Sequence, residues 1–348
     1  MITPGVRFWR RELLSISEKN CKNGAEYDSR HSIYRKPGVF RTMDRVKRQL
    51  GCSEEIQYRV VTEDICVAVL DTGIGNHPDF GERIVAFRDF VNGRHSLYDD
   101  SGHGTHVAGC LGGSGLLSQG RFSGIAPTCR LCVGKVLDEN GEGSIENMYH
   151  GLLWVLQNRL RYQIRVLNIS VGIGDSGTRG RMEELTGLLE RVCEEGVVVV
   201  CAAGNKGPKE GSLSPLGESR QVITVGCHEG GFFGNRKDLC EYYSGRGRAG
   251  RIDRKPDIVA PGTDVISCNL RWQRDRRGQY RDAYVKKSGT SMATPIVSGA
   301  ATLFLQKYPY CSSMQLKRRM LHAARDLGEE ETKQGWGMLD IEKMCTSY

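Results

Sequence analysis

The sequence lacks long hydrophobic runs. Among its 348 residues, no uninterrupted apolar stretch approaches the roughly 18 residues that a membrane-spanning helix requires. The N-terminal stretch MITPGVRFWRRELLSISEKN also lacks the apolar core of about 7 to 15 residues that marks a secretory signal peptide. With 39% hydrophobic and 26% charged residues, the composition is that of an ordinary globular protein. We therefore predict neither a membrane span nor a secretion signal.

A complete set of zinc-ligating residues is also missing. Cys129 and Cys132 form a CxxC pair, but no second pair or nearby histidine completes the four ligands of a zinc site. The 13 cysteines are an odd number, and several, such as Cys66 and Cys201, lie inside apolar runs. Buried, reduced thiols have this pattern. We therefore expect a cytoplasmic protein without a disulfide framework.

The positive charge is concentrated near the N-terminus. The net charge is +8, and residues 1–60 hold 13 Lys and Arg against 7 Asp and Glu. We divide the chain into a basic N-terminal extension, residues 1–58, and a folded domain, residues 59–348. The extension has no strand with interleaved aromatic residues and no helix-turn-helix pattern, so we do not expect nucleic-acid binding.

Short apolar runs alternate with longer helical segments after residue 60. The runs are too apolar for a sheet with one face in water, so we predict buried strands. Strand and helix in succession predict an α/β fold, a three-layer sandwich with a mostly parallel central sheet covered by helices on both faces. The predicted strands are 65–70, 131–137, 164–171, 196–203 and 222–226, and the predicted helices are 103–113, 144–160 and 181–196.

Four polar residues stand at the ends of these elements, where open α/β sheets carry their functional groups. Each one alone also fits a purely structural role in a turn, a helix or a helix cap. Ser101 could cap the helix that carries the histidine. Together they supply the acid, base, nucleophile and oxyanion donor of a nucleophilic hydrolase. The four are Asp71, His103, Asn205 and Ser291.

The order of the residues excludes two other hydrolase classes. An α/β-hydrolase presents its triad as Ser, acid and then His. The only histidine after Ser291 is His322, and no Asp or Glu lies between them. The HGTH stretch at residues 103–106 lacks the Glu and the i, i+4 histidine spacing of a zinc protease.

Six stretches of the chain resemble motifs of the subtilisin-like serine proteases, the subtilases. The resemblance runs from about residue 60 to about residue 345, and KVLDENGEGS with YSGRG is most similar to the AprX-type intracellular branch. The Asp, His and Ser motifs together make it highly specific. The six stretches are VAVLDTGIGNHPDF, DDSGHGTHVAG, LNISVG, AAGNKGP, KPDIVAPG and GTSMATPIVSGA.

The resemblance implies a serine endopeptidase that hydrolyses peptide bonds through an acyl-enzyme. By motif, Asp71 is the triad acid, His103 the general base and Ser291 the nucleophile. The side chain of Asn205 and the backbone N–H of Ser291 would form the oxyanion hole. His106, the second histidine of the motif, is assigned to packing. The alternative is a protease-like binding scaffold whose site is not used.

The resemblance also implies how a substrate binds. Two backbone edges would flank an extended peptide as neighbouring strands. Small residues would line the first specificity pocket and leave room for a large apolar side chain before the cut. Proteins or peptides are the expected partners, and the sequence indicates no oligomeric state. The expected substrate-binding residues are Gly141, Glu142, Gly143, Ser170, Val171, Gly172, Ala202, Ala203 and Gly204.

The chain departs from the secreted subtilisins at two places near the motifs. Ile296 replaces their His after Pro295, and because the AprX-type branch is similar here, we expect no loss of catalysis. The segment between HVAG and GIAP does not resemble their calcium-binding loop, and Asp79 matches a single ligand position. We therefore expect no required cofactor and no metal site, since the sequence does not support a structural calcium.

Two basic segments each have two interpretations. The extension is too short and irregular for the folded chaperone domain of the secreted relatives. It is either a solvated tail or an inhibitory prosegment that is cleaved before residue 60 by a reaction dependent on Ser291. The segment 269–287 holds seven Lys and Arg and two Asp. It is either a polar surface hairpin with Gly278 at its turn or a basic flap that attracts acidic peptides.

Overall fold

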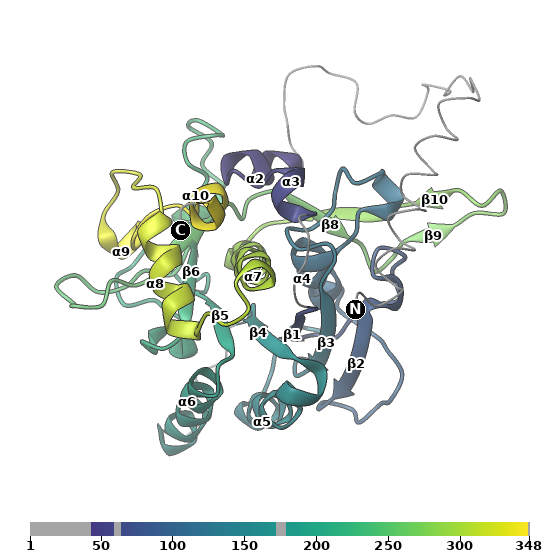
Figure 1. Ribbon diagram of the computed structural model, residues 1–348, viewed down its shortest axis with the longest axis horizontal. Helices are drawn as coiled ribbons and strands as arrows, with labels where there is room; N and C mark the ends of the chain where they lie inside the picture. The colour runs from purple at the N-terminus through teal and green to yellow at the C-terminus, as the bar shows by residue number, and fades with distance from the viewer. Residues whose placement is uncertain (1–42, 59–63, 172–178, 347–348) are drawn as a thin grey trace. The chain divides into compact units, whose positions relative to one another are not determined.

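A parallel sheet of seven strands forms the centre of the fold (Figure 1). The computed structural model describes residues 43–58, 64–171 and 179–346. The strand order is β2-β3-β1-β4-β5-β6-β7, and all neighbours run parallel. The strands are β1 Cys66–Asp71, β2 Ile84–Asp89, β3 Arg130–Lys135, β4 Ile164–Ile169, β5 Val198–Ala202, β6 Ile223–Cys227 and β7 Ile258–Ala260.

The central strand β1 lies where the strand order reverses. The chain continues from β1 to β2 and β3 on one side, and it returns to β4 on the other. Successive residues of β1 face opposite layers: Val67 and Val69 belong to one core, and Ala68 and Leu70 to the second. Open α/β sheets bind ligands beyond the carboxyl end of the strands at such a reversal.

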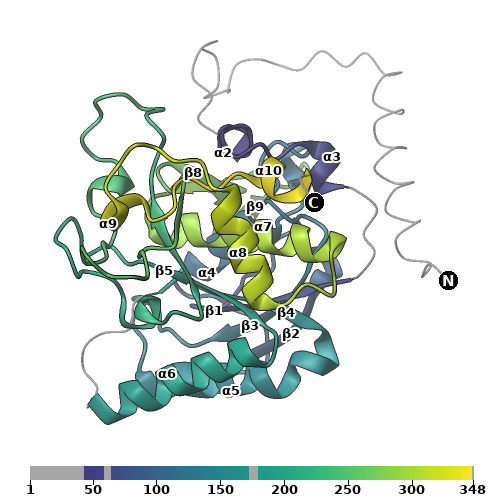
Figure 2. The ribbon, with the colours of Figure 1, turned by 60° about the vertical axis from the view of Figure 1, so that its left-hand side comes forward.

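Helices cover both faces of the sheet (Figure 2). Helices α5 and α6 pack together on one face, and α4 and α7 pack on the other, with α8 against β5. This is the predicted α/β sandwich. The helices are α2 Met43–Gln49, α3 Glu54–Gln57, α4 His103–Gly112, α5 Ile145–Tyr162, α6 Arg179–Glu194, α7 Thr290–Lys307, α8 Ser313–Ala323, α9 Glu331–Gln334 and α10 Ile341–Thr346.

The two short helices α2 and α3 share the core of the α7 face. Met43, Val46 and Leu50 are buried in the same apolar cluster as the α7 residues, and Gln57 donates hydrogen bonds to the backbone carbonyls of Gly124 and Ile125 at 2.7 and 2.8 Å. The boundary that we expect at residue 58 thus lies after two helices that pack on the folded domain. Residues 1–42 of the extension lie outside the described residues.

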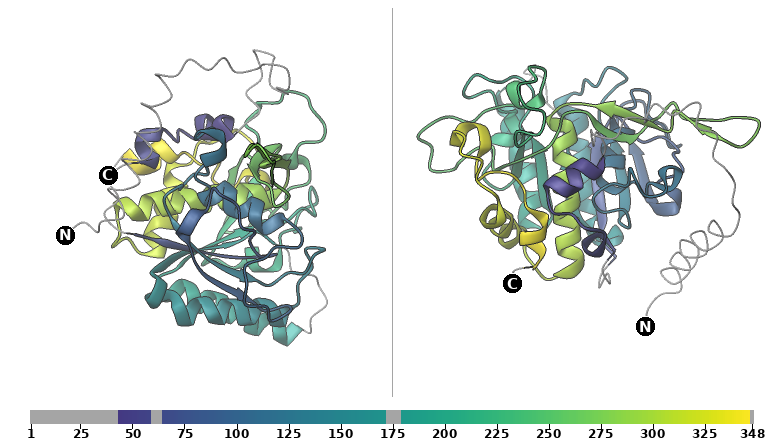
Figure 3. Two further views of the ribbon diagram at one scale, coloured as in Figure 1. Left: turned by 90° about the vertical axis from the view of Figure 1, so that its right-hand side faces the viewer. Right: turned by 90° about the horizontal axis from the view of Figure 1, so that it is seen from above.

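The basic segment 269–287 forms antiparallel ribbons. Strand β8, Val265–Cys268, pairs with β11, Tyr284–Lys287, and β9, Gln273–Arg274, pairs with β10, Tyr280–Arg281. Gly278 has a φ of 79° in the tight turn, a conformation that favours glycine. Figure 3 shows this hairpin projecting from the rest of the domain. The predicted hairpin is therefore present.

The structure also describes most of the cysteines and the lengths of the helices. The structure describes twelve of the cysteines, and all twelve are buried and form no disulfide with one another. None of the helices in the described ranges has both the length and the apolar character to span a bilayer.

Candidate active site

Asp71 and His103 meet at the carboxyl end of β1. Asp71 is the last residue of β1 and has a fully buried side chain, whereas His103 begins α4 with a side chain that is 24% exposed. Nδ1 of His103 lies 2.7 Å from Oδ1 of Asp71, which also accepts the N–H of Thr72 at 2.8 Å. Because an ionised carboxylate only accepts, Nδ1 carries the proton and Nε2 is an acceptor in the neutral ring. This arrangement prepares Nε2 to take a proton.

Asp99 holds the turn that leads into α4. Its Oδ1 accepts the N–H groups of Ser101 and Gly102 at 3.1 and 2.8 Å, and its Oδ2 accepts the N–H of Thr105 at 2.9 Å. Gly102 is the N-cap residue, so the prediction that Ser101 caps this helix is wrong. A carboxylate satisfies several donors at the positive end of the helix, which a single hydroxyl cannot do. In the sequence, the signal for this role was an Asp immediately before the first turn of the helix.

Opposing influences act on the two histidines of α4. Burial disfavours protonated His103, but the charge and hydrogen bond of Asp71 favour it, and the result is a raised pKa of His103. Lys287 of β11 acts against this protonation, and burial lowers the pKa of Lys287 itself. For His106, burial lowers the pKa to about 3, and Nε2 lies 3.1 Å from two backbone carbonyl oxygens. His106 is therefore a neutral, packed residue.

Asn205 contacts the beginning of α7, where Ser291 is the second residue. Its Oδ1 accepts the backbone N–H and the hydroxyl of Thr290, both at 3.1 Å. Since these bonds fix Oδ1, the Nδ2 amino group is the part of the amide that can donate to another acceptor. The N–H of Ser291 belongs to the first turn, whose N–H groups have no intrahelical acceptor. The Nδ2–H group of Asn205 and the backbone N–H of Ser291 are thus two donors available to an oxyanion at the start of α7.

Ser291 does not cap α7, because the N-cap residue is Gly289. Gly289 has a φ of 147°, and a β-carbon at this position would lie 3.4 Å from Nδ2 of Asn205. A glycine here both tolerates the backbone conformation and leaves room for the amide. The side chain of Ser291 is partly exposed. Of the two roles considered for Ser291, helix capping is excluded.

The expected walls of the specificity pocket follow two adjacent strands. Ser170 and Val171 come after β4 and are buried, and Ala202 ends β5 before Ala203 and Gly204. The pairing of β4 with β5 makes these stretches neighbours. Gly172 lies outside the described residues.

The expected second edge, residues 141–143, lies in the turn between β3 and α5. The N–H of Asp138 donates to the carbonyl of Glu142, and its carboxylate accepts the N–H of Glu142, both at 2.9 Å. Both backbone groups of Glu142 are therefore engaged within the turn. The N–H of Gly141 also donates to the carbonyl of Asp138 at 3.2 Å, so the groups that could pair with a peptide are the carbonyl of Gly141 and the backbone of Gly143.

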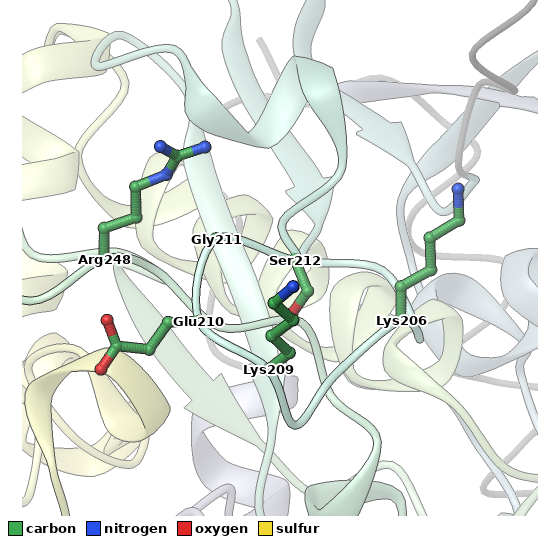
Figure 4. Close-up of a pocket in the computed structure, with 6 residues that line it drawn as sticks. All are labelled: Lys206, Lys209, Glu210, Gly211, Ser212 and Arg248. Atoms are coloured by element: carbon green, nitrogen blue, oxygen red, sulfur yellow. The ribbon is translucent and has the colours of Figure 1, made fainter.

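A charged pocket of about 500 Å³ begins directly after Asn205 (Figure 4). It carries three cationic side chains and one carboxylate, and the carboxylate, Glu210, accepts the N–H of Ala249 at 3.3 Å. Figure 4 shows the charged ends of Arg248 and Lys206 on opposite sides. This lining does not favour a large apolar side chain. The lining residues are Lys206, Lys209, Glu210, Gly211, Ser212 and Arg248.

His77, Asp79 and Cys268 form the metal-ligand-type cluster found among the described residues, with one potential ligand atom of each within 4.8 Å of the others. Hydrogen bonds already occupy these groups. The carboxylate of Asp79 accepts the hydroxyl of Tyr284 and the N–H of Gly115, both at 3.0 Å, and Nδ1 of His77 accepts the N–H of Asp79. Calcium prefers six to eight oxygen ligands. One carboxylate with a nitrogen and a sulfur does not fit that ion.

The chain is similar to proteins of one family over most of its length. Residues 62–337 match the Subtilase family. Serine protease AprX of Bacillus subtilis (strain 168) is 36% identical over 279 residues, which cover 77% of this chain but only 62% of that protein. Subtilisin Savinase of Lederbergia lenta is 35% identical over 276 residues, covering 79% of this chain and 88% of that protein.

Solved structures give the same result. A cold adapted subtilisin-like serine proteinase is 28% identical with a TM-score of 0.60, over 80% of this chain and 89% of that one. Sphericase is 25% identical with a TM-score of 0.65, over 82% of this chain and 96% of that one. The fold and the matched residues agree, and the chain belongs to the subtilase family of serine proteases.

Proposed function

We propose that the chain is a serine endopeptidase whose catalytic triad is Asp71, His103 and Ser291. The observation that carries the proposal is the 2.7 Å contact between buried Asp71 and His103 at the carboxyl end of the central strand. Membership of the subtilase family supports Ser291 as the nucleophile. The amide of Asn205 at the start of α7 supports an oxyanion hole there.

In the proposed reaction, Nε2 of His103 takes the hydroxyl proton of Ser291 while Oγ attacks the carbonyl carbon of the substrate. Asp71 stabilises the imidazolium that forms. The N–H of Ser291 and Nδ2–H of Asn205 donate to the oxyanion of the tetrahedral intermediate. His103 then returns the proton to the leaving amine as the C–N bond breaks. Water attacks the acyl-enzyme by the same route and releases the carboxylic acid.

The proposed substrates are extended segments of proteins or peptides. The backbone after β4, the carbonyl of Gly141 and the backbone of Gly143 would pair with the main chain of the substrate, which makes recognition broad. The small residues after β4 and β5 favour a large apolar side chain before the cut. A panel of peptides that differ at this position tests that preference. The apolar preference fails if Glu peptides exceed Phe and Leu peptides in kcat/KM.

The hydrolysis of unfolded casein tests the activity itself. We expect the wild type to cleave it, and Ser291→Ala to abolish cleavage while the variant remains folded by circular dichroism. Ser313→Ala is the control, since its hydroxyl donates to the backbone carbonyl of Cys193 at 3.2 Å and it belongs to α8, which carries none of the proposed catalytic groups. Cleavage by Ser291→Ala at the wild-type rate would contradict the proposal.

The proposed enzyme requires no cofactor and works in a reducing compartment. Every catalytic group of the triad is a side chain of this chain, so the acyl-transfer steps need no bound metal. Free, buried thiols such as Cys66 and Cys201 are typical of proteins from reducing compartments. The extension before α2 would act as a prosegment that the enzyme itself removes.

A further inference from the structure

We propose that Arg45 of helix α2 is a positioning residue for the nucleophile Ser291 and acts through Glu229. This inference rests on the proposed function, since it concerns how the nucleophile is held. Residues far apart in the sequence form the connection in three steps. Each step is a hydrogen bond between groups of the described chain.

The first step is a buried ion pair. The guanidinium of Arg45 pairs through Nη1 with Oε2 of Glu229, and the two side chains are 2% and 0% exposed. Nη2 of Arg45 donates to the carbonyl of Thr263 at 2.7 Å, and the guanidinium lies 4.8 Å from the centroid of the Phe233 ring. Gln49, one turn further along α2, donates to the carbonyl of Glu229 at 2.9 Å. Helix α2 thus binds both the side-chain carboxylate and the backbone carbonyl of Glu229.

The second step joins Glu229 to the loop after β7. Its other carboxylate oxygen, Oε1, accepts the N–H groups of Gly262 and Thr263 at 2.9 and 2.7 Å. Thr263 also accepts the N–H of Cys240 through its hydroxyl at 2.9 Å. One carboxylate therefore bridges a cation from α2 and two backbone donors of the loop.

The third step joins this loop to the start of α7. The carbonyl of Gly262 accepts the N–H of Gly289 at 3.0 Å, and Asp264 donates its N–H to the hydroxyl of Ser288 at 2.9 Å. A β-carbon on Gly262 would lie 2.7 Å from the carbonyl oxygen of Gly289, so only glycine allows this approach. Ser291 follows two residues after Gly289. The ion pair of α2 is therefore connected to the backbone that carries the nucleophile.

Loss of Arg45 would leave the charge of Glu229 buried without its cation. A buried charge in this state draws in water or moves toward solvent, and either change shifts the loop that it holds. A misplacement of about 1 Å at a reacting group can cost about 10²-fold in rate. The proposed substrate edges follow other strands, so the loss should fall on kcat and leave KM nearly unchanged.

The inference also limits where the extension can be cut. A cut after Arg45 would release the cation from the domain, so active enzyme must keep α2. The proposed autoprocessing should therefore occur before residue 43. Figures 1 and 2 show α2 against the domain.

The experiment compares three variants of the pair with a matched control in the full chain. The test variants are Arg45→Met, Arg45→Lys and Glu229→Gln. The control is Lys317→Met, which removes a buried cation 2.7 Å from Asp257 while Lys255 remains 2.7 Å from the same carboxylate. The readouts are kcat and KM, measured below each variant's unfolding temperature, and amide hydrogen exchange of the peptide that contains Ser291.

We expect Arg45→Met to lower kcat at least tenfold with KM within twofold, and to speed the exchange of the Ser291 peptide. Arg45→Lys should recover part of kcat, and Lys317→Met should keep kcat within twofold even if it melts earlier. A folded Arg45→Met with wild-type kcat and exchange would overturn the inference. Failure of all three test variants to fold would also overturn it, because the pair would then serve folding alone. If the wild type proves inactive, the proposed function fails, and exchange at the Ser291 peptide still decides the connection.

Discussion

Replacing Asn205 tests the assignment of the oxyanion hole. Asn205→Ala removes the Nδ2–H donor, and the loss of one such donor costs about 10² to 10³ in kcat, or about 2.7–4 kcal/mol. Asn205→Asp should cost more, because its second oxygen would bring a negative charge toward the developing oxyanion. KM should change little in both variants, since the donor acts mainly in the transition state.

The contacts of Asn205 predict a smaller, graded effect at its neighbour. Thr290 supplies both bonds that fix Oδ1, one from its N–H and one from its hydroxyl, each at 3.1 Å. Thr290→Val removes the hydroxyl bond and keeps the other. A single hydrogen bond contributes about 0.5–1.5 kcal/mol, which corresponds to a loss of about 2- to 12-fold in kcat. The amide would then be less firmly oriented without losing its donor.

Steady-state kinetics on a chromogenic peptide amide separates these effects. Thermal unfolding of each variant provides the control for stability. The reasoning is refuted if Asn205→Ala stays within tenfold of the wild-type kcat, or if the loss appears in KM. An effect of Thr290→Val larger than that of Asn205→Ala would also contradict it.

Four further predictions concern the general base His103, the metal-ligand-type cluster around Asp79, the basic hairpin and the N-terminal extension. Because Asp71 raises the pKa of His103 above its ordinary value near 6.5 and the base must be neutral, kcat/KM should rise with pH through that raised pKa. In Asp71→Asn the inflection should move to lower pH, and an unmoved inflection would contradict this. Adding EGTA should leave the unfolding temperature within about 2 °C, since hydrogen bonds satisfy Asp79, whereas a large fall would indicate a bound cation. Mass spectrometry should find an N-terminus cut before residue 43 in the wild type and an intact one in Ser291→Ala, and identical N-termini would reject autoprocessing. Replacing the hairpin arginines by Ser should lower kcat/KM for acidic peptides at 0.1 M salt, where the Debye length is about 10 Å, but not at 1 M, where it is about 3 Å. Equal effects on neutral peptides would reject attraction by charge. The hairpin residues are Arg274, Arg276 and Arg277.

The buried elements of the fold could be predicted from the sequence, and the edges could not. The five predicted strands and three predicted helices are present with ends within two residues of those expected. Their continuous apolar runs reflect burial on both faces of a parallel sheet. Strand β2 was not predicted because it lies at the edge of the sheet and most of its side chains are only partly buried. Strand β7 has three residues, too few for a periodic pattern.

The site residues that lie in local sequence motifs could be predicted. Asp71 and His103 were expected to meet because the ends of neighbouring elements converge at the reversal of the sheet, and the structure places them 2.7 Å apart. The role of Asp99 at α4 was missed because a nearby serine offered a competing cap. The Arg45–Glu229 pair could not be foreseen, since its members are 184 residues apart and neither lies in a motif. The charge of the pocket after Asn205 was missed because Arg248 comes from a separate loop.

Active-site labelling tests the central claim most directly. A fluorophosphonate probe reacts with a serine that is activated by a neighbouring base and placed beside oxyanion donors. We predict that the native protein, freed of its extension, is labelled stoichiometrically at Ser291, and that His103→Ala reduces the labelling rate by orders of magnitude. A folded, processed protein that leaves Ser291 unlabelled would contradict the account and favour a protease-like binding scaffold.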